Sequence, residues 1–557
     1  MEARSIGRLT ATLVPPPRAM GRRCTSGGWG PDRLPAQSCE DPVRVVLVQP
    51  PRKYWPYTSE GDNFLLQQAL PALAAPLRAA GHDVHVIDCM PLHIGWRSLA
   101  DELRRLDPDV IASGENHALY ASEALRFFKM CKEVAPRAKT LAGGGHFTNL
   151  SHRYSRARDD GTPPDIDAIC IGEGEQTIVD VVDAWASANA DLSKVEGLAY
   201  FDGEKAVRTP TRKLIHDLDL LPMPAYDLLP MHLYGKSRYL FSPGGTTIHH
   251  SRGCVSKCSF CAWWTVMADR KYDENGKAQL SPRWRSKSVE RVMEEISELY
   301  YRYGKRSYVW VDESWNIDPR FNDQFADAMI HSGMKTKWFA FMRADCIVRD
   351  EKKGILEKLI RAGLSHILIG VERAEDDSLT LLDKRFYTGG VAEAALKIFK
   401  ERYPDVFVQA TFIVGVKDES PESLQKQVAL ASKLDIDFPA FHPITPVPGT
   451  PIYDEAIEKG WITESDFDNF DWLSPVLDTK YMTRDEIALS LYEMNKKFVN
   501  NKWLAKGLLS RVPYKRDMYI WFAKVSASVA IDAIKQRINP LKVENYQQLV
   551  TPEWYDG

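Results

Sequence analysis

The chain has 557 residues, of which 44% are hydrophobic and 26% are charged, and its formal net charge is −3 at pH 7. This length is too great for one hydrophobic core and predicts two or three domains. The small net charge excludes a general attraction to nucleic acid or to an anionic membrane. Apolar runs of about 18 residues, which a simple membrane span requires, are absent from the sequence.

The first part of the chain has the composition of an unstructured leader. Residues 1–42 are rich in Arg, Pro, Gly and Ser and show no apolar periodicity. Their longest apolar stretch, Leu9 to Val14, is too short and too polar for the core of a signal peptide. We therefore expect a disordered leader, or translation that starts at Met20, rather than a targeting segment.

Residues 43–190 alternate between strand and helix patterns. Strands are predicted at 43–49, 83–88, 109–113, 138–142 and 168–172, and helices at 64–80, 97–105, 119–134 and 175–188. The strands are continuously apolar, which is typical of a doubly wound parallel sheet buried on both faces. Such sheets bind ligands beyond the carboxyl ends of their strands. Glycine-rich turns follow two of these ends: Gly143, Gly144 and Gly145 after the fourth strand, and Glu173 with Gly174 after the fifth.

A second alternating series follows a proline-rich connector, predicted at residues 191–239. Within residues 240–455, strands are predicted at 246–250, 307–312, 338–345, 366–372, 408–415 and 438–446, and helices at 288–303, 321–332, 351–362, 390–402 and 421–433. Six strands separated by helices are typical of a partial (β/α)6 barrel, with its active site at the carboxyl ends of the strands. Residues 456–557 are predicted to be helical. The expected fold class is therefore α/β, with a helical C-terminal region.

Three cysteines lie together directly after the first strand of this second series. Cys254, Cys258 and Cys261 fall within eight residues, whereas the other six of the nine cysteines are dispersed, which favours a reduced cytoplasm and a metal or cluster site. Three thiolates from one short loop can bind three irons of a cubane cluster and leave the fourth iron open. A structural zinc site needs four protein ligands, and the sequence has no second CxxC pair. The spacing favours the cluster, with zinc as the alternative.

The CxxxCxxC motif at the end of a first barrel strand resembles the radical SAM superfamily. Four later segments are also similar to parts of that superfamily, namely WRSKSVERVMEEI (284–296), VWVDESWNID (309–318), ILIGVE (367–372) and PVPGTP (446–451). The resemblance implies a [4Fe-4S] cluster whose open iron binds S-adenosylmethionine (SAM), and an electron donor. It also implies that Arg343, Glu372 and Gln409, expected at strand ends, hydrogen-bond SAM.

The domain that precedes the barrel resembles the cobalamin-binding domain of one large radical SAM subclass. The resemblance rests on GGGHFTN (143–149) and IGEGEQT (171–177), and it assigns Gly143, Gly144, Gly145, Glu173 and Gly174 to cobalamin. The alternative is that the glycines only form a tight turn. One departure is that the loop after the first strand, PPRKYWPYTSEGDNF, lacks the histidine of the D-x-H-x-x-G motif that many cobalamin proteins use to bind cobalt.

Together these resemblances imply a cytoplasmic enzyme that moves a methyl group from SAM, via methylcobalamin, to a substrate carbon. The layout also resembles the tryptophan 2-C-methyltransferases of thiopeptide pathways, which makes C2 of tryptophan in antibiotic biosynthesis the preferred acceptor. Strand alternation puts Tyr308, Trp310 and Asp312 on one face. Tyr308 is the candidate base near the indole nitrogen, the alternative being a packed barrel residue.

Three other functions stay open. The enzyme could methylate a carbon of another natural product or peptide, or could be an anaerobic cobalamin-linked oxidative cyclase. A non-enzymatic cobalamin sensor is disfavoured because the sequence shows no basic DNA-binding helix pair. The expected partners are a small-molecule substrate and an electron donor, with no nucleic acid and no membrane.

Overall fold

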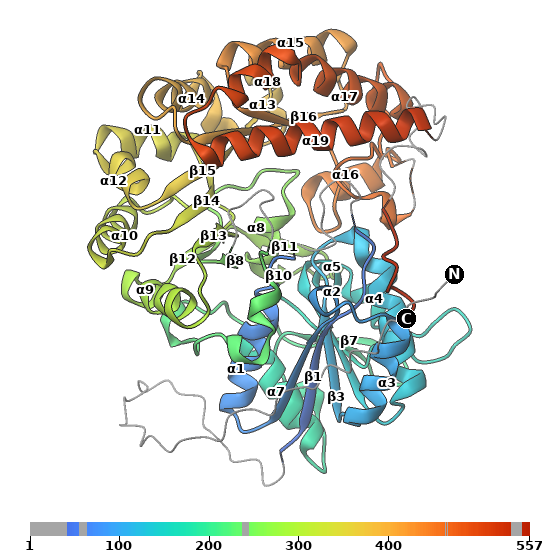
Figure 1. The fold of residues 1–557 in the computed structure, drawn as a ribbon. Coiled ribbons are helices and arrows are strands. Elements are labelled where there is room, and N and C mark those ends of the chain that lie inside the picture. Colours follow the sequence, from blue (N-terminus) through green and yellow to red (C-terminus); the bar gives the residue numbers. More distant parts are fainter. Residues whose placement is uncertain (1–41, 55–63, 237–243, 463, 465, 536–548) are drawn as a thin grey trace, which may run out of the picture. The chain divides into compact units, whose positions relative to one another are not determined.

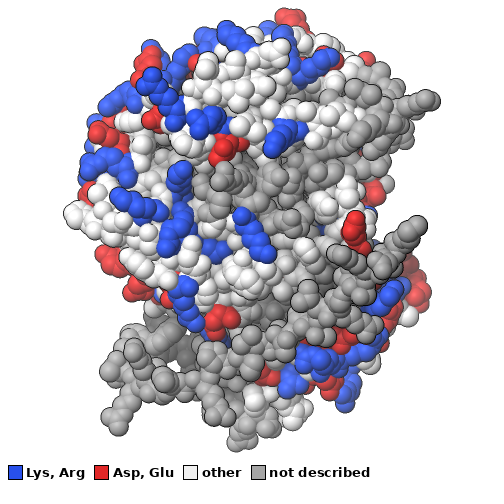
Figure 2. Space-filling view, in the orientation of Figure 1, with Lys and Arg blue, Asp and Glu red and all other residues white. Residues whose placement is uncertain are grey.

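The computed structural model describes residues 42–54, 64–236, 244–462, 464, 466–535 and 549–557. The predicted leader, apart from its last residue, lies outside the described residues. Among the described helices, none combines the length and hydrophobicity that a membrane crossing needs. Lys and Arg side chains are interspersed with Asp and Glu over the face drawn in Figure 2.

The first sheet follows the order β2-β1-β3-β4-β5-β6-β7. Its strands are β1 (Arg44–Gln49), β2 (Asp83–Asp88), β3 (Val110–Gly114), β4 (Lys139–Gly143), β5 (Ala168–Cys170), β6 (Leu198–Phe201) and β7 (Ala206–Arg208). The first five strands are parallel. Their order is that of a doubly wound sheet with a switch point between β1 and β3. The predicted parallel sheet is therefore confirmed.

Helices cover both faces of this sheet (Figure 1). They are α1 (Ala69–Ala79), α2 (Cys89–Leu92), α3 (Trp96–Leu106), α4 (Ala121–Val134), α5 (Gly144–Asn149), α6 (Ser151–Tyr154) and α7 (Glu175–Ala186). Successive residues of β1 pack in opposite directions: Val45 and Leu47 join the cluster that contains α1 and α7, whereas Val46 and Val48 join the cluster that contains α3 and α4. A strand buried on both faces needs apolar residues at every position, which explains the continuous apolar run.

The predicted connector contains regular structure that the sequence did not indicate. Strand β6 pairs with β5 and strand β7 pairs with β6, both antiparallel, so residues 198–208 extend the first sheet. The sequence analysis did not predict these two strands. These strands have only four and three residues, and pairing with an existing sheet edge stabilises segments too short to be recognised from their own pattern.

The second sheet follows the order β17-β16-β15-β14-β13-β8, and all its pairs are parallel. Its strands are β8 (Gly245–Ile248), β13 (Ser307–Trp310), β14 (Lys337–Met342), β15 (Leu364–Glu372), β16 (Phe407–Val414) and β17 (Phe438–Pro443). The connecting helices are α9 (Val289–Ser297), α10 (Pro319–Ser332), α11 (Ala344–Lys352), α12 (Ile355–Arg361), α13 (Asp376–Leu381), α14 (Val391–Arg402) and α15 (Pro421–Leu434). This arrangement confirms the predicted partial (β/α)6 barrel. The predicted helix 351–362 is instead two helices, because Gly354 adopts a φ of +71° between them.

Short elements that were not predicted surround the three cysteines. They are β9 (Ser251–Gly253), α8 (Ala262–Val266), β10 (Asp269–Tyr272), β11 (Ala278–Ser281) and β12 (Trp284–Ser286). Strand β9 pairs antiparallel with β12, and β10 pairs antiparallel with β11. The cysteine segment is therefore enclosed between a strand pair and a hairpin rather than being a free loop.

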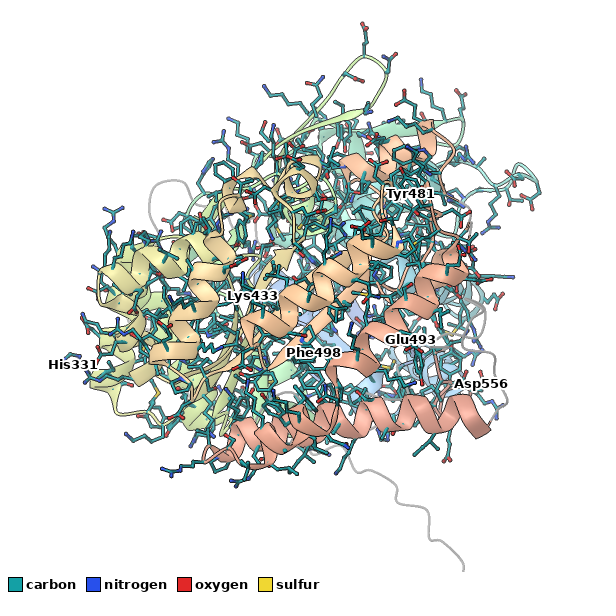
Figure 3. The ribbon with its side chains drawn as sticks, turned by 90° about the horizontal axis from the view of Figure 1, so that it is seen from above. His331, Lys433, Tyr481, Glu493, Phe498 and Asp556 are labelled. Carbon is teal, nitrogen blue, oxygen red and sulfur yellow. The ribbon has the colours of Figure 1, made fainter. Side chains whose placement is uncertain are left out.

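The C-terminal region is helical, as predicted. Its helices are α16 (Pro451–Glu458), α17 (Arg484–Phe498), α18 (Asn501–Leu508) and α19 (Pro513–Lys535). Helix α17, which carries Glu493 and Phe498, packs beside α15, where Lys433 lies (Figure 3). Helices α18 and α19 are fixed to the barrel by Asp437, which accepts hydrogen bonds from Trp503 Nε1 through its carbonyl at 2.6 Å and from the Tyr519 hydroxyl through Oδ1 at 2.6 Å.

Candidate functional site

The cysteine segment begins where β9 ends and continues into α8. Cys261 is the N-cap residue of α8. Burial raises the pKa of Cys261 to about 12, and the backbone amides of Trp263 and Trp264 act in the opposite direction. Cys254 Sγ accepts the Ser256 amide at 3.4 Å. Burial also raises the pKa of Cys258, so a metal that binds Cys258 and Cys261 must displace their protons.

The three thiols fit a cluster better than a single ion. Cys258 interacts electrostatically with Cys254, and Cys261 interacts with both. Over the described part of the chain, no three His, Cys, Asp or Glu side chains converge closely enough to hold one metal ion. A cluster asks for a different geometry, because each thiolate binds its own iron. Three neighbouring thiols in one segment match that donor set.

Arg343 lies next to the cysteine segment. It is the N-cap residue of α11, directly after β14, and its guanidinium contacts the Ser256 hydroxyl. The same guanidinium donates to Asp345 at 2.9 and 3.1 Å. The structure therefore brings Arg343 to the cysteines from a strand end, as the sequence predicts.

Glu372 lies at the carboxyl end of β15, also close to the cysteines. Its Oε1 is 2.6 Å from Lys384 Nζ and its Oε2 accepts the Thr411 hydroxyl at 3.1 Å. A Cβ at Gly370 would stand 2.1 Å from Oε1 of Glu372, so glycine is required for the carboxylate to fold back over its own strand. Both Lys384 and Glu372 act electrostatically on Cys258. A buried carboxylate beside the thiols suits a cationic cosubstrate such as SAM.

Gln409 lies near the amino end of its strand. It is the third residue of β16 and pairs in register with Leu368 and Phe438. It lies two residues before Thr411, which contacts Glu372. Arg343 and Glu372 lie at the carboxyl ends of their strands, and the hydrogen bond of Gln409 to SAM stays a prediction.

The glycine turn after β4 lets three segments approach closely. Gly144 has a φ of +84°, and a Cβ there would lie 2.5 Å from the carbonyl oxygen of Glu115. The Gly145 amide donates to Asn116 Oδ1 at 2.9 Å, and a Cβ at Gly145 would lie 2.8 Å from Val266 of α8. Gly143 is the N-cap residue of α5. The turn thus joins the end of β3 to the helix that follows the cysteines.

Glu173 does not present its carboxylate to a ligand. Its Oε1 accepts from Arg252 at 2.8 Å, and its Oε2 accepts from Arg285 at 2.9 Å and from the Ile215 amide at 2.7 Å. Protein donors therefore occupy both oxygens of Glu173, and its assignment to cobalamin stays a prediction. Gly174 is the N-cap residue of α7, and a Cβ there would lie 3.0 Å from Leu73.

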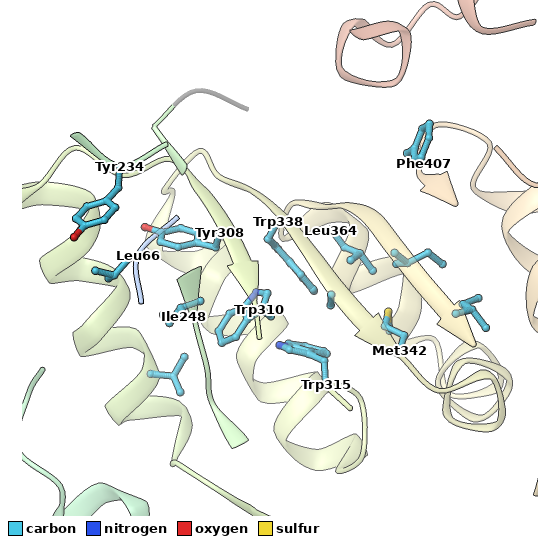
Figure 4. Packing of buried hydrophobic residues seen from close by; sticks show 14 of the residues in the cluster. Leu66, Tyr234, Ile248, Tyr308, Trp310, Trp315, Trp338, Met342, Leu364 and Phe407 are labelled. Atoms are coloured by element: carbon cyan, nitrogen blue, oxygen red, sulfur yellow. The ribbon is translucent and has the colours of Figure 1, made fainter. Parts of the chain in front are cut away.

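Tyr308 is part of the barrel core, and its predicted role as a base is corrected. It is the second of the four residues of β13, and its hydroxyl donates to the Lys305 carbonyl at 3.2 Å, which lies before the amino end of the strand. Burial raises its pKa well above that of a free phenol. Figure 4 shows Tyr308 in the same buried layer as Trp310, Trp315 and Trp338. The opposite face of the strands carries Val311 and Phe341, whose side chains are 42% and 36% exposed.

Sequence reasoning missed His442 on β17. Its Nδ1 lies 3.2 Å from the Trp472 carbonyl, and its ring interacts electrostatically with Glu372. Burial lowers the pKa of His442, so the ring is neutral near pH 7. A carbonyl only accepts hydrogen bonds, so Nδ1 carries the proton and Nε2 keeps a lone pair. A polar residue within an apolar strand, FPAFHP, was the signal that could have identified it.

A small cavity lies between the glycine turn, α8 and the segment that follows β17. It is lined by Asn116, Gly145, His146, Asn149, Ala262, Trp263, Val266, Val447 and Pro448. Trp263, which is 43% exposed, stacks on Trp472 with ring centroids 6.3 Å apart, and the ring of His117 contacts both. The glycine turn, the helix after the cysteines and the segment that follows β17 therefore share one site.

Comparison with known families agrees with this two-part site. Residues 62–182 match the B12-binding domain, and residues 248–430 match the radical SAM superfamily. The chain is therefore an enzyme that combines a B12-binding domain with a radical SAM domain. Its cofactors are a [4Fe-4S] cluster, SAM and cobalamin. The radical SAM match includes all three cysteines of the cluster motif.

Two relatives of this radical SAM enzyme differ in the reaction their names describe. An uncharacterized methyltransferase of Pyrococcus horikoshii is 29% identical over 451 residues, which cover 80% of this chain and 90% of the relative. The anaerobic magnesium-protoporphyrin IX monomethyl ester cyclase of Cereibacter sphaeroides is 28% identical over 441 residues, which cover 78% of this chain and 66% of the relative.

A solved structure shares the fold of this radical SAM enzyme. The radical SAM methyltransferase TsrM from Kitasatospora setae, with cobalamin and a [4Fe-4S] cluster bound, superposes with a TM-score of 0.62 at 14% identity, over 88% of this chain and 100% of TsrM. TsrM was also solved with tryptophan substrate and a SAM analogue, with a TM-score of 0.62 at 14% identity over 88% of this chain and 99% of TsrM. The likeness concerns the arrangement of the two sheets and the helical C-terminal region.

Proposed function

We propose that this enzyme moves a methyl group from SAM, via methylcobalamin, to a carbon atom of a small-molecule substrate. The observation that carries the proposal is the close packing of the glycine turn of the B12-binding domain on the helix after the cysteines, where a Cβ at Gly145 would lie 2.8 Å from Val266. Methyl transfer by way of cobalt requires the corrin and SAM to reach the same place. A reductant is needed to maintain the cluster and the cobalt, and we propose that the reaction takes place in the cytoplasm.

The proposed acceptor is C2 of tryptophan, in antibiotic biosynthesis. The fold shared with TsrM, whose structure holds tryptophan, supports this choice. The exposed face of Trp263 and its stacked partner Trp472 also suit a flat aromatic ring. Methylation of another natural product or peptide remains the first alternative. The similarity to the Cereibacter sphaeroides cyclase favours an oxidative cyclase as the second.

The chain offers residues for each task. Arg343 and Glu372 are proposed to hold SAM beside the cysteines, and the glycine turn at 143–145 together with Gly174 is proposed to let cobalamin approach the backbone. His442 replaces Tyr308 as the proposed base. Its neutral ring, with Nδ1 fixed by Trp472, leaves Nε2 able to accept the proton that an indole loses on methylation.

The test follows both halves of the reaction in one assay. The reconstituted enzyme is incubated anaerobically with SAM, cobalamin, a reductant and tryptophan, and methylcobalamin and methyltryptophan are measured over time. We expect both to form. Methylcobalamin without methyltryptophan would refute the acceptor but not the reaction class. The absence of methylcobalamin would refute the proposed function, and a porphyrin substrate that gains oxygen or loses hydrogen would establish the cyclase alternative.

A further inference from the structure

A buried group of four charges joins the B12-binding domain to the strand that leads to the cluster. Two of its members, Arg252 on β9 and Arg285 on β12, are direct partners in the antiparallel pair. Direct partners point to the same face of a sheet at close range, and like charges there repel. Both arginines are buried, so this strand pair depends on carboxylates supplied from elsewhere.

Both carboxylates come from the turn that follows β5. Glu173 bridges the two arginines, with Oε1 2.8 Å from Arg252 and Oε2 2.9 Å from Arg285. Glu175 takes the other side of the Arg252 guanidinium at 2.5 Å. Burial alone would raise the pKa of Glu173, but Arg252 and Arg285 hold it below its usual value. Two positive and two negative charges therefore balance inside the protein.

On one side, this group is continuous with the predicted cobalamin turns. Glu173 and Glu175 flank Gly174 in the IGEGEQT segment of the B12-binding domain. The Gly172 amide donates to the Thr148 hydroxyl at 3.1 Å, and Thr148 belongs to α5, the helix that begins within the glycine turn. The segment that carries both carboxylates is therefore hydrogen-bonded to the helix of the glycine turn.

On the other side, the group is continuous with the first cluster cysteine. Arg252 precedes Cys254 by two residues, and the residue between them, Gly253, donates its amide to Glu313 Oε2 at 2.9 Å. A Cβ at Gly253 would lie 1.9 Å from the Arg283 carbonyl. The backbone between Arg252 and Cys254 is therefore closely packed and held by Glu313, which places the position of Arg252 next to that of Cys254.

We propose that Arg252 is a positioning residue for the cluster, and that the B12-binding domain holds it in place through Glu173 and Glu175. Cobalamin binding and SAM binding are then coupled through this charge group. Bound cobalamin would fix the positions of Glu173 and Glu175 and therefore of Arg252, and this would favour the cluster geometry that binds SAM. The inference rests on the two cofactor domains and not on the identity of the methyl acceptor.

The test is a comparison of SAM affinity in cluster-loaded full-length protein with and without cobalamin. In the unmodified protein we expect cobalamin to tighten SAM binding by about fivefold or more, the usual size of a coupling between two sites. Glu175→Gln keeps the shape but removes one partner of Arg252, and we expect the ratio of the two affinities to fall to within about twofold of one. The electron paramagnetic resonance spectrum of the reduced cluster with SAM bound should change when cobalamin is added to the unmodified protein. In Glu175→Gln this change should be absent.

Controls separate this coupling from other effects. Asp227→Asn breaks another arginine–carboxylate pair, with Arg78 at 2.6 Å, and should leave the ratio unchanged. Arg252→Lys keeps the charge but cannot bridge both carboxylates. It is the second test variant, to be used if Glu175→Gln does not retain the cluster, and it should also lower the ratio of the SAM affinities measured with and without cobalamin. If the coupling came instead from direct contact between the two cofactors, the ratio would be unchanged by these substitutions. A ratio near one in the unmodified protein, or a full ratio in both variants, would overturn the proposal.

Discussion

Two ion pairs lie beside the cysteines, and they differ in exposure. Lys384 pairs with Glu372 at side-chain exposures of 12% and 8%, whereas Asp345, the partner of Arg343, is 36% exposed. Removing one member of a buried pair leaves an uncompensated charge, which costs about 3–5 kcal/mol. The Lys384–Glu372 pair is therefore the one whose loss should destabilise the protein.

Two substitutions distinguish His442, the base proposed from the structure, from Tyr308, the base predicted from the sequence. Tyr308→Phe removes the hydrogen bond to the Lys305 carbonyl and should cost about 1 kcal/mol of unfolding free energy, with methyl transfer unchanged. His442→Gln should slow methyl transfer to substrate by about a hundredfold, since a positioned base contributes that much or more. Rapid-quench measurement of substrate methylation, with methylcobalamin formation as the internal control, checks both. A large loss in Tyr308→Phe with none in His442→Gln would reverse the assignment.

At the level of secondary structure, the sequence was most informative where the apolar pattern is continuous. Strand β2 (Asp83–Asp88) has the bounds that its pattern predicts, β1 begins one residue later than predicted, and β3 is shifted by one residue at both ends. Both sheets could be predicted because their strands are buried and separated by helices of ordinary length. The short strands β6, β9 and β12 could not, because partners distant in sequence stabilise them, and β7 forms a hairpin with β6.

The same distinction applies to the site. The three cysteines could be identified because their spacing within one loop encodes the donor set. Arg343 and Glu372 could be placed at strand ends by pattern. The partners of Glu173 could not be foreseen, since Arg252 and Arg285 lie 79 and 112 residues further along the chain. His442 was missed because the role of a single histidine depends on which carbonyl it meets.

The glycine turn after β4 should tolerate substitution poorly. Gly144→Ala forces an alanine into the left-handed region, which costs about 1–2 kcal/mol, and also places its Cβ against the Glu115 backbone. Gly161→Ala is the matched control, because Gly161 has a similar φ of +80° with no atom within 4 Å of the added carbon. Urea unfolding should show a larger loss for Gly144→Ala, and only that variant should lose cobalamin. Equal losses would mean that close approach at this turn is unimportant.

At the scale of the whole molecule, the free energy of unfolding should decrease at low pH because the Asp312 carboxylate holds the backbone that precedes the cysteines. Asp312 Oδ1 accepts the amides of His250 and Ser251 at 3.1 and 2.6 Å and lies 2.9 Å from His250 Nδ1. Burial opposes ionisation of Asp312, but His250 and Ser251 hold its pKa below the usual value. A lowered pKa contributes stability above about pH 4, the value for an unfolded aspartate, and this contribution is lost as the pH falls through the folded value.

The prediction is that unfolding free energy declines below about pH 4, and that Asp312→Asn flattens this part of the profile. Asp377→Asn, at an exposed aspartate, serves as the control and should keep the full slope. Urea titrations at several pH values measure the effect. If Asp312→Asn keeps the unmodified slope, the carboxylate does not stabilise this strand end.

The account depends most directly on what the three cysteines bind. Iron, zinc and cobalt are to be quantified in anaerobically reconstituted protein, alongside Cys258→Ala and, as a control, Cys131→Ala at a buried thiol of α4. We predict about four irons per chain, as a [4Fe-4S] cluster requires, with cobalt present, loss of iron in Cys258→Ala and retention in Cys131→Ala. Zinc in place of iron, or full iron content in Cys258→Ala, would contradict the account.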